Sequence, residues 1–520
     1  MASHTQTELD SALTQLTESG LAFRRGTPPE AQYTFKHALV QDAAYDSLLK
    51  TRRQALHAKI ARVLEEHFPT TKDTEPELLA HHLTAAGETE RAVDYWQKAG
   101  DLASKRLALK EAISHLNQGM AIIGTLPQSA ERDGKELDLR IPLGTAWLAL
   151  KGWAAPEVWS SFSPALGLAK SLRRHAALAP IYYGLYANVL VQGRVAEALD
   201  WVKEMLASAE ASGDTDLLIV GHRSACTSYY FRGDFNQSRE HGDRVLALYS
   251  EKQHRHLADI MNTDPKTTTG LFVSAGTWIL GYPDRAVQVS GANDAHARSR
   301  GHAFDLGYAL TLGSWLSDYR CEPERLLARV EEAERLGRVH NLPFVSEVIA
   351  QLMKGVAWLR AGRLAEGIPH LRAAMERWNA NGGLTWMPYF RAVLAEGLAL
   401  SGDIEGGLSL IEDSLTQIAR PGWEERCHLA EVLRLKGWML QQQGKLAAAE
   451  ENYLASLDVA REQQAKSWEL RTSTSLAKLW QSQGKGKEAY DLLAPVYNWF
   501  TEGFDTKDLQ EAKALLGDLS

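Results

Sequence analysis

Histidine is the residue type whose clustering in this sequence most readily suggests chemistry. Near-paired histidines occur at His81 and His82, at His254 and His256, and at His296 and His302. A zinc site needs three or four Cys, His or carboxylate ligands that converge, and adjacent residues of a helix point apart. No convincing ligand set accompanies these histidines in the sequence. We therefore expect them to be solvated or to cap helices, and we predict no metal site.

The motifs of nucleophilic catalysis and phosphate binding are missing from the sequence. It contains no GxSxG elbow and no GxxxxGK[ST] loop, because GKGKEA at Gly484 has a different spacing. Cys226, Cys321 and Cys427 lie too far apart in sequence for a metal or redox pair. A Ser-His-Asp site assembled from distant residues stays open. We nevertheless expect no enzyme activity and no cofactor, because helical repeats rarely host such chemistry.

A basic run, KTRRQALHAK from Lys50 to Lys59, could contact DNA. In helical register, however, Arg52, Lys59 and Arg62 do not form one continuous basic face, and acidic residues lie between them. The formal net charge of -8 also argues against a chain that mainly neutralises phosphates. A solvated face or an intramolecular docking surface is favoured, so nucleic acid is not the expected ligand.

Length and composition are those of a folded protein with several domains or a repeat array. The 520 residues exceed one ordinary core, and hydrophobic and charged residues make up 45% and 23% of the chain. No run of about 18 apolar residues occurs, and the first residues have no apolar stretch typical of a signal peptide. We expect a cytoplasmic protein without a membrane segment.

Glycine-centred turns recur along the chain and indicate a repeat. The turn glycines are Gly87, Gly193, Gly233, Gly281, Gly362, Gly402, Gly444 and Gly484. Several follow one another at about 40 residues, a period typical of helical repeat arrays. SDYRCEPERL, around Cys321, fits one more unit whose turn lacks glycine. Each glycine can supply the positive φ that ends the first helix of a pair.

Small residues flank these turns at fixed distances. The fifth residue after each glycine is Ala, Ser or Gly, and the seventh before it is small in every unit except at Tyr186. Small residues at matching positions let two helices approach closely as an antiparallel hairpin. This pattern resembles the tetratricopeptide repeat, with units longer than the roughly 34 residues of that family. The resemblance covers about residues 75–515 and implies an all-α, right-handed superhelical solenoid of antiparallel helix pairs.

The first seventy residues follow another pattern. A helix that ends near Gly20, strands in LAFRR and QYTFK joined by GTPPEA, and helices at about 37–49 and 51–68 predict a hairpin wing with two helices. FKHALVQDAAYDSLL, from Phe35 to Leu49, resembles the winged-helix end of bacterial STAND-class ATPases. The closest likeness is to multidomain regulators that join a class III adenylyl cyclase, an ATPase and a tetratricopeptide tail. MNTDPKTTTGLFVSAGTWILGYPDRA, from Met261, also resembles such tails.

The departure from that family matters for function. Without a phosphate-binding loop or a visible pair of cyclase aspartates, neither activity can be carried over, and the chain resembles a truncated or split relative. We predict a partial winged-helix segment at residues 1–70 and a repeat array at 71–520. Within the array, the repeats are degenerate at about 100–192 and regular at about 177–515. An irregular insertion at 254–270 is expected to be non-helical at Asp264-Pro265.

In tetratricopeptide geometry, positions 13, 10, 6 and 3 before the turn glycine face the concave groove. Here these positions include aromatic, Arg and Glu residues, a mixture that suits a peptide or helix with apolar anchors and charges. The candidate groove residues are Arg223, Tyr230, Trp278, Tyr389, Glu396, Glu431, Arg434, Trp438, Arg471 and Lys478.

The sequence therefore predicts a non-catalytic module that binds a protein or peptide in the groove of a helical array. Two alternatives stay open. The chain could be a regulatory fragment that acts on a separate ATPase or cyclase chain, or a transcription regulator that binds DNA through its winged helix.

Overall fold

The computed structural model describes residues 5–27 and 31–520 and divides into two compact units. The first comprises residues up to Leu139 and the second runs from Arg140 to Ser520, so the boundary falls within helix α8 (Ala130–Lys151). The predicted boundary at residue 70 lies inside the first unit and stays a prediction. No helix in the described ranges is both long enough and apolar enough to cross a membrane.

The first unit begins with the mixed segment that the sequence predicts. Its two strands pair antiparallel, with Ala22 opposite Phe35 and Arg25 opposite Gln32. The expected connection GTPPEA falls partly on residues 28–30, which lie outside the described residues. Helices α5 to α7 then pack as successive neighbours. The elements of this unit are α1 (Gln6–Glu18), β1 (Ala22–Arg25), β2 (Gln32–Phe35), α2 (Ala38–Asp46), α3 (Lys50–His67), α4 (Thr71–Thr74), α5 (Pro76–Ala86), α6 (Thr89–Lys105) and α7 (Leu109–Ile123).

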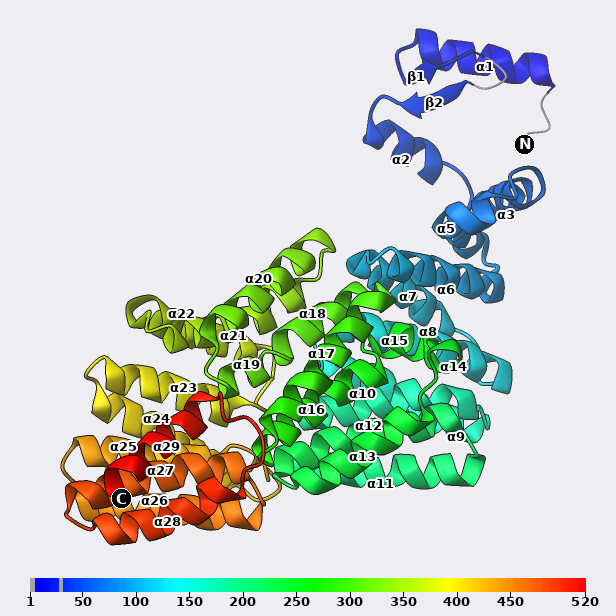
Figure 1. The fold of residues 1–520 in the computed structure, drawn as a ribbon. Coiled ribbons are helices and arrows are strands. Elements are labelled where there is room, and N and C mark those ends of the chain that lie inside the picture. Colours follow the sequence, from blue (N-terminus) through cyan, green and yellow to red (C-terminus); the bar gives the residue numbers. More distant parts are fainter. Residues whose placement is uncertain (1–4, 28–30) are drawn as a thin grey trace. The chain divides into compact units, whose positions relative to one another are not determined.

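The second unit is all-α and forms a superhelical array of antiparallel helix pairs (Figure 1). Its first half comprises α9 (Pro156–Ser171), the 3-10 turn η1 (His175–Ala177), α10 (Leu178–Val191), α11 (Val195–Ser212), α12 (Thr215–Arg232), α13 (Phe235–Leu248), α14 (Glu251–His254), α15 (His256–Met261), α16 (Pro265–Ile279), α17 (Pro283–Arg300), α18 (Ala303–Leu312) and α19 (Trp315–Tyr319). Its second half comprises α20 (Pro323–Val339), the π-helical segment η2 (Phe344–Ile349), α21 (Ala350–Arg360), α22 (Leu364–Ala380), α23 (Met387–Leu400), α24 (Ile404–Ile418), α25 (Leu429–Gln442), α26 (Leu446–Glu462), α27 (Lys466–Ser482), α28 (Gly486–Trp499) and α29 (Lys507–Leu519).

The turns within the helix pairs have the backbone conformation that the glycine pattern predicts. All eight turn glycines have positive φ, from 74° at Gly362 to 99° at Gly402. Cys321 occupies the same position in its own pair with φ 58°, although it carries a side chain. The predicted unit without glycine is therefore present.

Close helix approach explains the small residues on both sides of each turn. A Cβ added at Gly407 would stand 2.8 Å from the carbonyl oxygen of Ala395 on the preceding helix. In another pair, the Ser238 hydroxyl donates a hydrogen bond to the Cys226 carbonyl at 2.8 Å. A larger side chain at these positions would push the two helices apart.

The expectation that Asp264-Pro265 prevents a helix is wrong, because these two residues begin α16. Asp264 is the N-cap, and its carboxylate accepts a hydrogen bond from the Thr267 amide at 2.9 Å. Proline fits the first helical position because its missing N–H would have no partner inside the helix. The insertion is also mostly helical, and Asn262, with φ 61°, is the C-cap of α15.

Within the second unit, helix pairs that are far apart in sequence also contact each other. The Leu384 amide donates a hydrogen bond to the Val191 carbonyl at 2.8 Å, and the Arg426 amide donates one to the Phe231 carbonyl at 2.8 Å. Further along, α16 lies beside α27. We call this junction the seam; it joins Val191, Gly193, Phe231 and Gly233 to Leu384, Trp423, Arg426 and Gln463. At the seam, early and late helix pairs of the array are in direct contact.

Candidate functional site

The predicted groove residues all lie on the first helices of their pairs, within the second unit. Arg223 and Tyr230 are on α12, and Trp278 is on α16. Helices α23, α25 and α27 carry the other seven. The structure places them in four different environments. Whether they bind a ligand stays a prediction.

Tyr230 and Trp278 lie in the aromatic interior that the seam encloses. Tyr230 is fully buried and Trp278 is 2% exposed. The Tyr230 hydroxyl is 2.9 Å from that of Tyr319, which in turn lies 2.6 Å from Nε2 of His428. The Trp278 ring packs edge-on against Trp468, with ring centroids 5.0 Å apart. Both side chains are therefore covered by other parts of the chain in this conformation.

Burial also determines the charge of His428. It lowers the pKa of the imidazole to about 4, against the weaker opposing effect of Asp318 and Glu431. The ring is thus neutral near pH 7, which lets one nitrogen accept a hydrogen bond from the Tyr319 hydroxyl.

A second group of predicted residues belongs to a charged network on the inner surface. The Arg360 guanidinium donates to Asp318 at 2.6 Å and is also paired with Glu396. The Tyr389 hydroxyl donates to the same Asp318 carboxylate at 2.9 Å. Arg360 and Glu396 are each 24% exposed at the side chain, whereas Asp318 is 3% exposed.

The network continues over α25, α27 and α29. Arg434 and Glu431 form a two-pronged ion pair at 2.8 Å, and Arg471 lies 3.8 Å from Glu431 and 3.0 Å from Asp508. These side chains are 13% to 18% exposed. We call the set of Asp318, Arg360, Glu396, Glu431, Arg434, Arg471 and Asp508 the inner charge network.

Electrostatics within the network strongly favours the ionised form of Glu431. Burial alone raises the pKa of this carboxyl, but Arg434 and Arg471 outweigh burial and lower the pKa to about 2. Asp508 behaves in the opposite way, since burial and the nearby Glu431 raise its pKa despite Arg471. The network thus holds closely matched charges of both signs beside a cavity of about 20 Å³, lined by Tyr389, His428, Glu431 and Arg471 among others.

The remaining two residues on these helices are more accessible. Trp438 is partly buried and packs against hydrophobic clusters formed by α23 to α27. Lys478 is exposed and forms an ion pair with Glu511. These two residues share α25 and α27 with members of the charge network but do not belong to it.

Arg223 lies apart from this network, in a second cavity of about 20 Å³. Its side chain is buried, the residue being 4% exposed, and its guanidinium lies over the Tyr183 ring at 4.7 Å from the centroid. Trp153, Phe272 and Tyr308 also line this cavity. Among the ten predicted residues, Arg223 is therefore the one that lines this aromatic cavity.

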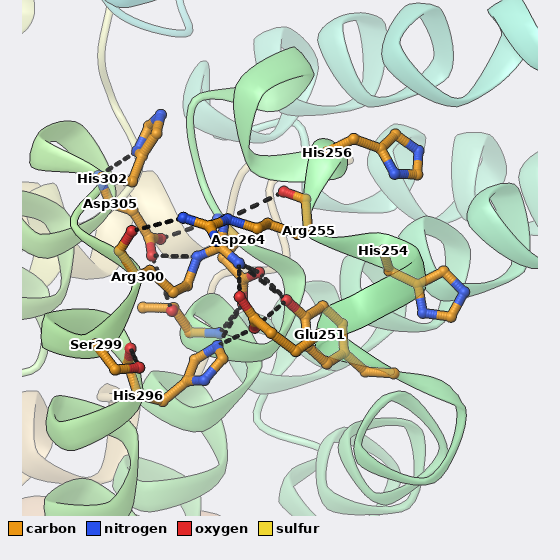
Figure 2. Close-up of polar contacts among 12 residues, drawn as sticks. Glu251, His254, Arg255, His256, Asp264, His296, Ser299, Arg300, His302 and Asp305 are labelled. Atoms are coloured by element: carbon orange, nitrogen blue, oxygen red, sulfur yellow. Dashed lines mark hydrogen bonds and ion pairs between the residues drawn. The ribbon is translucent and has the colours of Figure 1, made fainter.

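His296 and His302, which follow the insertion in sequence, belong to a polar cluster that Figure 2 shows. His302 caps α18 by accepting a hydrogen bond from the Asp305 amide at 3.2 Å, while His296 lies 3.2 Å from Asp264. Arg300 lies 3.2 Å from the same Asp264. Burial and the nearby Asp264 raise the pKa of Asp305 to about 7. The charges here are satisfied by each other, so the cluster fixes the insertion to α17 and α18.

The rule of positions 13, 10, 6 and 3 before the turn glycine did not select Asp318 or Arg360. A signal for Asp318 existed, because it stands three residues before Cys321, the residue that replaces glycine in its turn. The same rule applied to Cys321 also gives Tyr308, which lines the cavity of Arg223. Arg360 carries no comparable signal. In the described ranges, no group of three or more His, Cys, Asp or Glu residues has an arrangement that could hold a metal ion.

Comparison with known proteins places the fold among helical repeat proteins. No family model matches the chain. An uncharacterized protein of Rhizobium meliloti (strain 1021) is 23% identical over 489 residues, which cover 91% of this chain and 46% of that protein. The chain thus spans about half the length of the curated relative that it matches.

Two solved structures are similar in fold at 12% sequence identity and a TM-score of 0.50. A Rap protein complexed with competence and sporulation factor matches over 72% of this chain and 99% of its own. The Cut9–Hcn1 hetero-tetramer of APC/C matches over 92% of this chain and 85% of its own. Both are tetratricopeptide-like arrays, so the chain has the fold of this class.

Proposed function

We propose that the chain is a non-catalytic binding module that holds a protein or peptide ligand at the inner charge network. The helical repeat fold supports this proposal, since such arrays expose a curved inner face built from many side chains. The solved structure of the similar Rap protein is a complex with competence and sporulation factor, and that of Cut9 is a complex with Hcn1. These complexes make a protein or peptide a reasonable ligand class for this chain.

The observation that carries the proposal is the partial exposure of the network. Arg434 and Glu431 keep 16% and 13% of their side-chain surface in contact with solvent, as do their neighbours on α21 and α27 to a similar degree. Because it is partly exposed, the network presents both charge signs to solvent, on the same helices as Trp438 and the exposed Lys478. A ligand with acidic, basic and apolar groups can pair with such a surface.

A peptide-display selection on the intact chain tests the proposal. Enriched peptides are measured by fluorescence anisotropy against the wild type and against the double variant Glu431→Gln with Arg434→Met. Removing both partners avoids leaving one charge unpaired. We expect at least about tenfold weaker binding by the double variant, because charge-assisted hydrogen bonds to the ligand are lost.

The matched control removes an ion pair of the same type elsewhere. Arg244 and Glu240 on α13 are each 52% exposed and lie 2.7 Å apart. The variant Glu240→Gln with Arg244→Met should bind as the wild type does, and both variants should keep the helical circular-dichroism signal. Equal binding by the two double variants, or no peptide that binds the wild type, would overturn the proposal.

A second candidate is that the array regulates a nucleotide-dependent catalytic segment. It rests on the resemblance of residues 35–49 to the winged-helix end of STAND-class ATPases. The curated relative, of which this chain matches less than half, is long enough to contain a further segment. Affinity capture of the intact chain and of the Glu431→Gln, Arg434→Met variant from the native cell extract tests this candidate. Recovery of the same ATPase or cyclase chain with both proteins would support regulation through another surface. Recovery of no such chain with either would contradict it.

A further inference from the structure

Arg223 is a buried cation that has no carboxylate partner. Within residues 5–27 and 31–520, its guanidinium forms no ion pair; Nη2 donates to Thr268 Oγ1 at 3.3 Å and approaches the Tyr183 hydroxyl at 3.5 Å. Both distances are long for hydrogen bonds. Nε has no hydrogen-bond partner in the same ranges. Much of the hydrogen-bonding capacity of this guanidinium is therefore unused.

Other buried arginines of the chain show what Arg223 lacks. Arg300, with 2% of its side chain exposed, lies 3.1 Å from Glu251 and 3.2 Å from Asp264. Arg360, which is less buried, is paired with Asp318 and with a second carboxylate. Removing a charge from water is unfavourable unless an opposite charge accompanies it. At Arg223 the described part of the chain supplies aromatic rings and hydroxyls but no anion.

The cavity beside Arg223 offers room for such an anion. Its volume of about 20 Å³ exceeds what one water molecule needs, and its wall combines the guanidinium with aromatic rings. The hydroxyl of Tyr308, which lines this cavity, makes no hydrogen bond to any part of the chain that the structure describes. The Tyr183 hydroxyl, by contrast, already accepts a hydrogen bond from Trp153 Nε1 at 3.0 Å. The space therefore holds one cation and one unused hydroxyl.

We propose that this cavity binds the carboxylate of a small organic acid. The planar guanidinium matches a carboxylate in shape and charge, and the Tyr308 hydroxyl supplies a further donor. A single cation matches a monoanion, and the aromatic wall accommodates the apolar part of the acid. Because the space is small, we expect the acid to be of about the size of acetate. The site uses none of the residues of the inner charge network, so it is independent of the proposed peptide binding.

Titration of the intact chain with sodium acetate tests the proposal. Trp153 and Trp386 line the cavity, so tryptophan fluorescence reports on its occupancy. At constant ionic strength we expect a saturable change with acetate, and none with acetamide or sodium chloride. Acetate should also raise the melting temperature, by roughly 2–5 °C at 100 times its Kd. N-acetylalanine and its amide, tested in the same way, show whether the carboxylate of a peptide end can also enter.

Two variants separate ligand binding from a structural role of Arg223. Arg223→Met removes the charge at similar length, so we expect it to abolish the acetate response and to raise the melting temperature of the unliganded protein. Arg223→Lys should weaken acetate binding about tenfold, because it loses the two-pronged geometry. Arg244→Met, on the exposed face of α13, should respond to acetate as the wild type does.

The wild-type titration alone can overturn the proposal. Identical responses to acetate, acetamide and chloride would do so, even if Arg223→Met failed to fold. A saturable response that survives in Arg223→Met would place acetate elsewhere. A response to inorganic phosphate but to neither acid would exclude a carboxylate site. A saturable response to acetate or to N-acetylalanine that is lost in Arg223→Met would support it, and the two acids would identify the source of the carboxylate.

Discussion

The Trp423 ring lies so close to Gly193 that a Cβ added there would stand 2.3 Å from its carbon atoms. Gly193 ends the first helix of an early pair, and Trp423 precedes α25 much later in the chain. Glycine is therefore required at this turn for two reasons: a positive φ and contact across the seam.

Substitution of Gly193 by alanine should separate these two requirements. The matched variant is Gly444→Ala, since Gly444 has φ 76° against 81° at Gly193 but open space beside it. We expect Gly444→Ala to lower the free energy of unfolding by about 1–2 kcal/mol through backbone strain. Gly193→Ala should lose about 1–3 kcal/mol more, because the seam must open. Urea unfolding measures both free energies. Equal losses would show that the contact with Trp423 does not contribute to stability.

Truncation of Trp278 should destabilise the protein more than truncation of Trp438. Trp278→Ala leaves a cavity among Trp468, Tyr319 and Arg471, so we expect a loss of about 3–5 kcal/mol in the free energy of unfolding. Trp438 is only partly buried, and its loss should be about 1–2 kcal/mol. Denaturant unfolding of both variants checks this ranking. A reversed order would mean that Trp278 is not packed as described.

Acid should destabilise the protein through Glu431. The folded pKa is about 2 and the ordinary value is 4.5, so the unfolded state binds the proton first as the pH falls. The stabilisation is present above pH 4.5 and is lost towards pH 2, with a magnitude of up to about 3 kcal/mol. We expect the difference in unfolding free energy between wild type and Glu431→Gln to shrink between pH 5 and pH 2.5. A constant difference over this range would contradict the assigned shift.

Glu425 should have the opposite pH dependence. Burial raises its pKa to about 8, although it accepts hydrogen bonds from the Trp386 amide and from Trp423 Nε1. The folded state therefore keeps the proton between pH 4.5 and 8, and stability falls as the pH rises through this window. By pH 7 the loss is up to about 3 kcal/mol. Glu425→Gln keeps an acceptor without the charge.

The test for Glu425 compares the pH dependence of stability in a variant and in the wild type. In thermal unfolding, the melting temperature of Glu425→Gln should rise relative to that of the wild type steadily from pH 5 to pH 8. Glu424→Gln, one residue earlier and exposed, is the matched control and should follow the wild-type profile. If both variants have the same profile, the Glu425 carboxyl does not titrate in this window.

The repeat itself could be predicted because its signals are local. Turn glycines such as Gly233 must adopt positive φ, and small residues such as Ser238 must face the preceding helix, so each unit carries its own pattern. Cys321 shows the limit of such patterns, since the turn forms with φ 58° without glycine. Asp264-Pro265 shows another limit, because the same dipeptide can interrupt a helix or begin one.

The enclosure of the inner surface could not be predicted from the sequence. The groove positions lie on the first helix of each pair, but whether a residue there is exposed to solvent depends on the small rotation between successive helix pairs, added over many pairs. Tyr230 is covered because Tyr319 and Trp315, far along the chain, return to it. No local pattern reports such a return. The inner charge network has the same origin, since Arg360 and Asp318 belong to different units.

An open array can unfold one helix pair at a time, because each pair contacts only its two neighbours. The hydrogen bonds from Leu384 to Val191 and from Arg426 to Phe231 remove that independence. If the late helices unfolded, the early helices would lose these hydrogen bonds across the seam. The second compact unit should therefore unfold in one cooperative thermal transition. Folding must likewise close a loop of great length before the seam forms, which makes it slow for an all-helical chain.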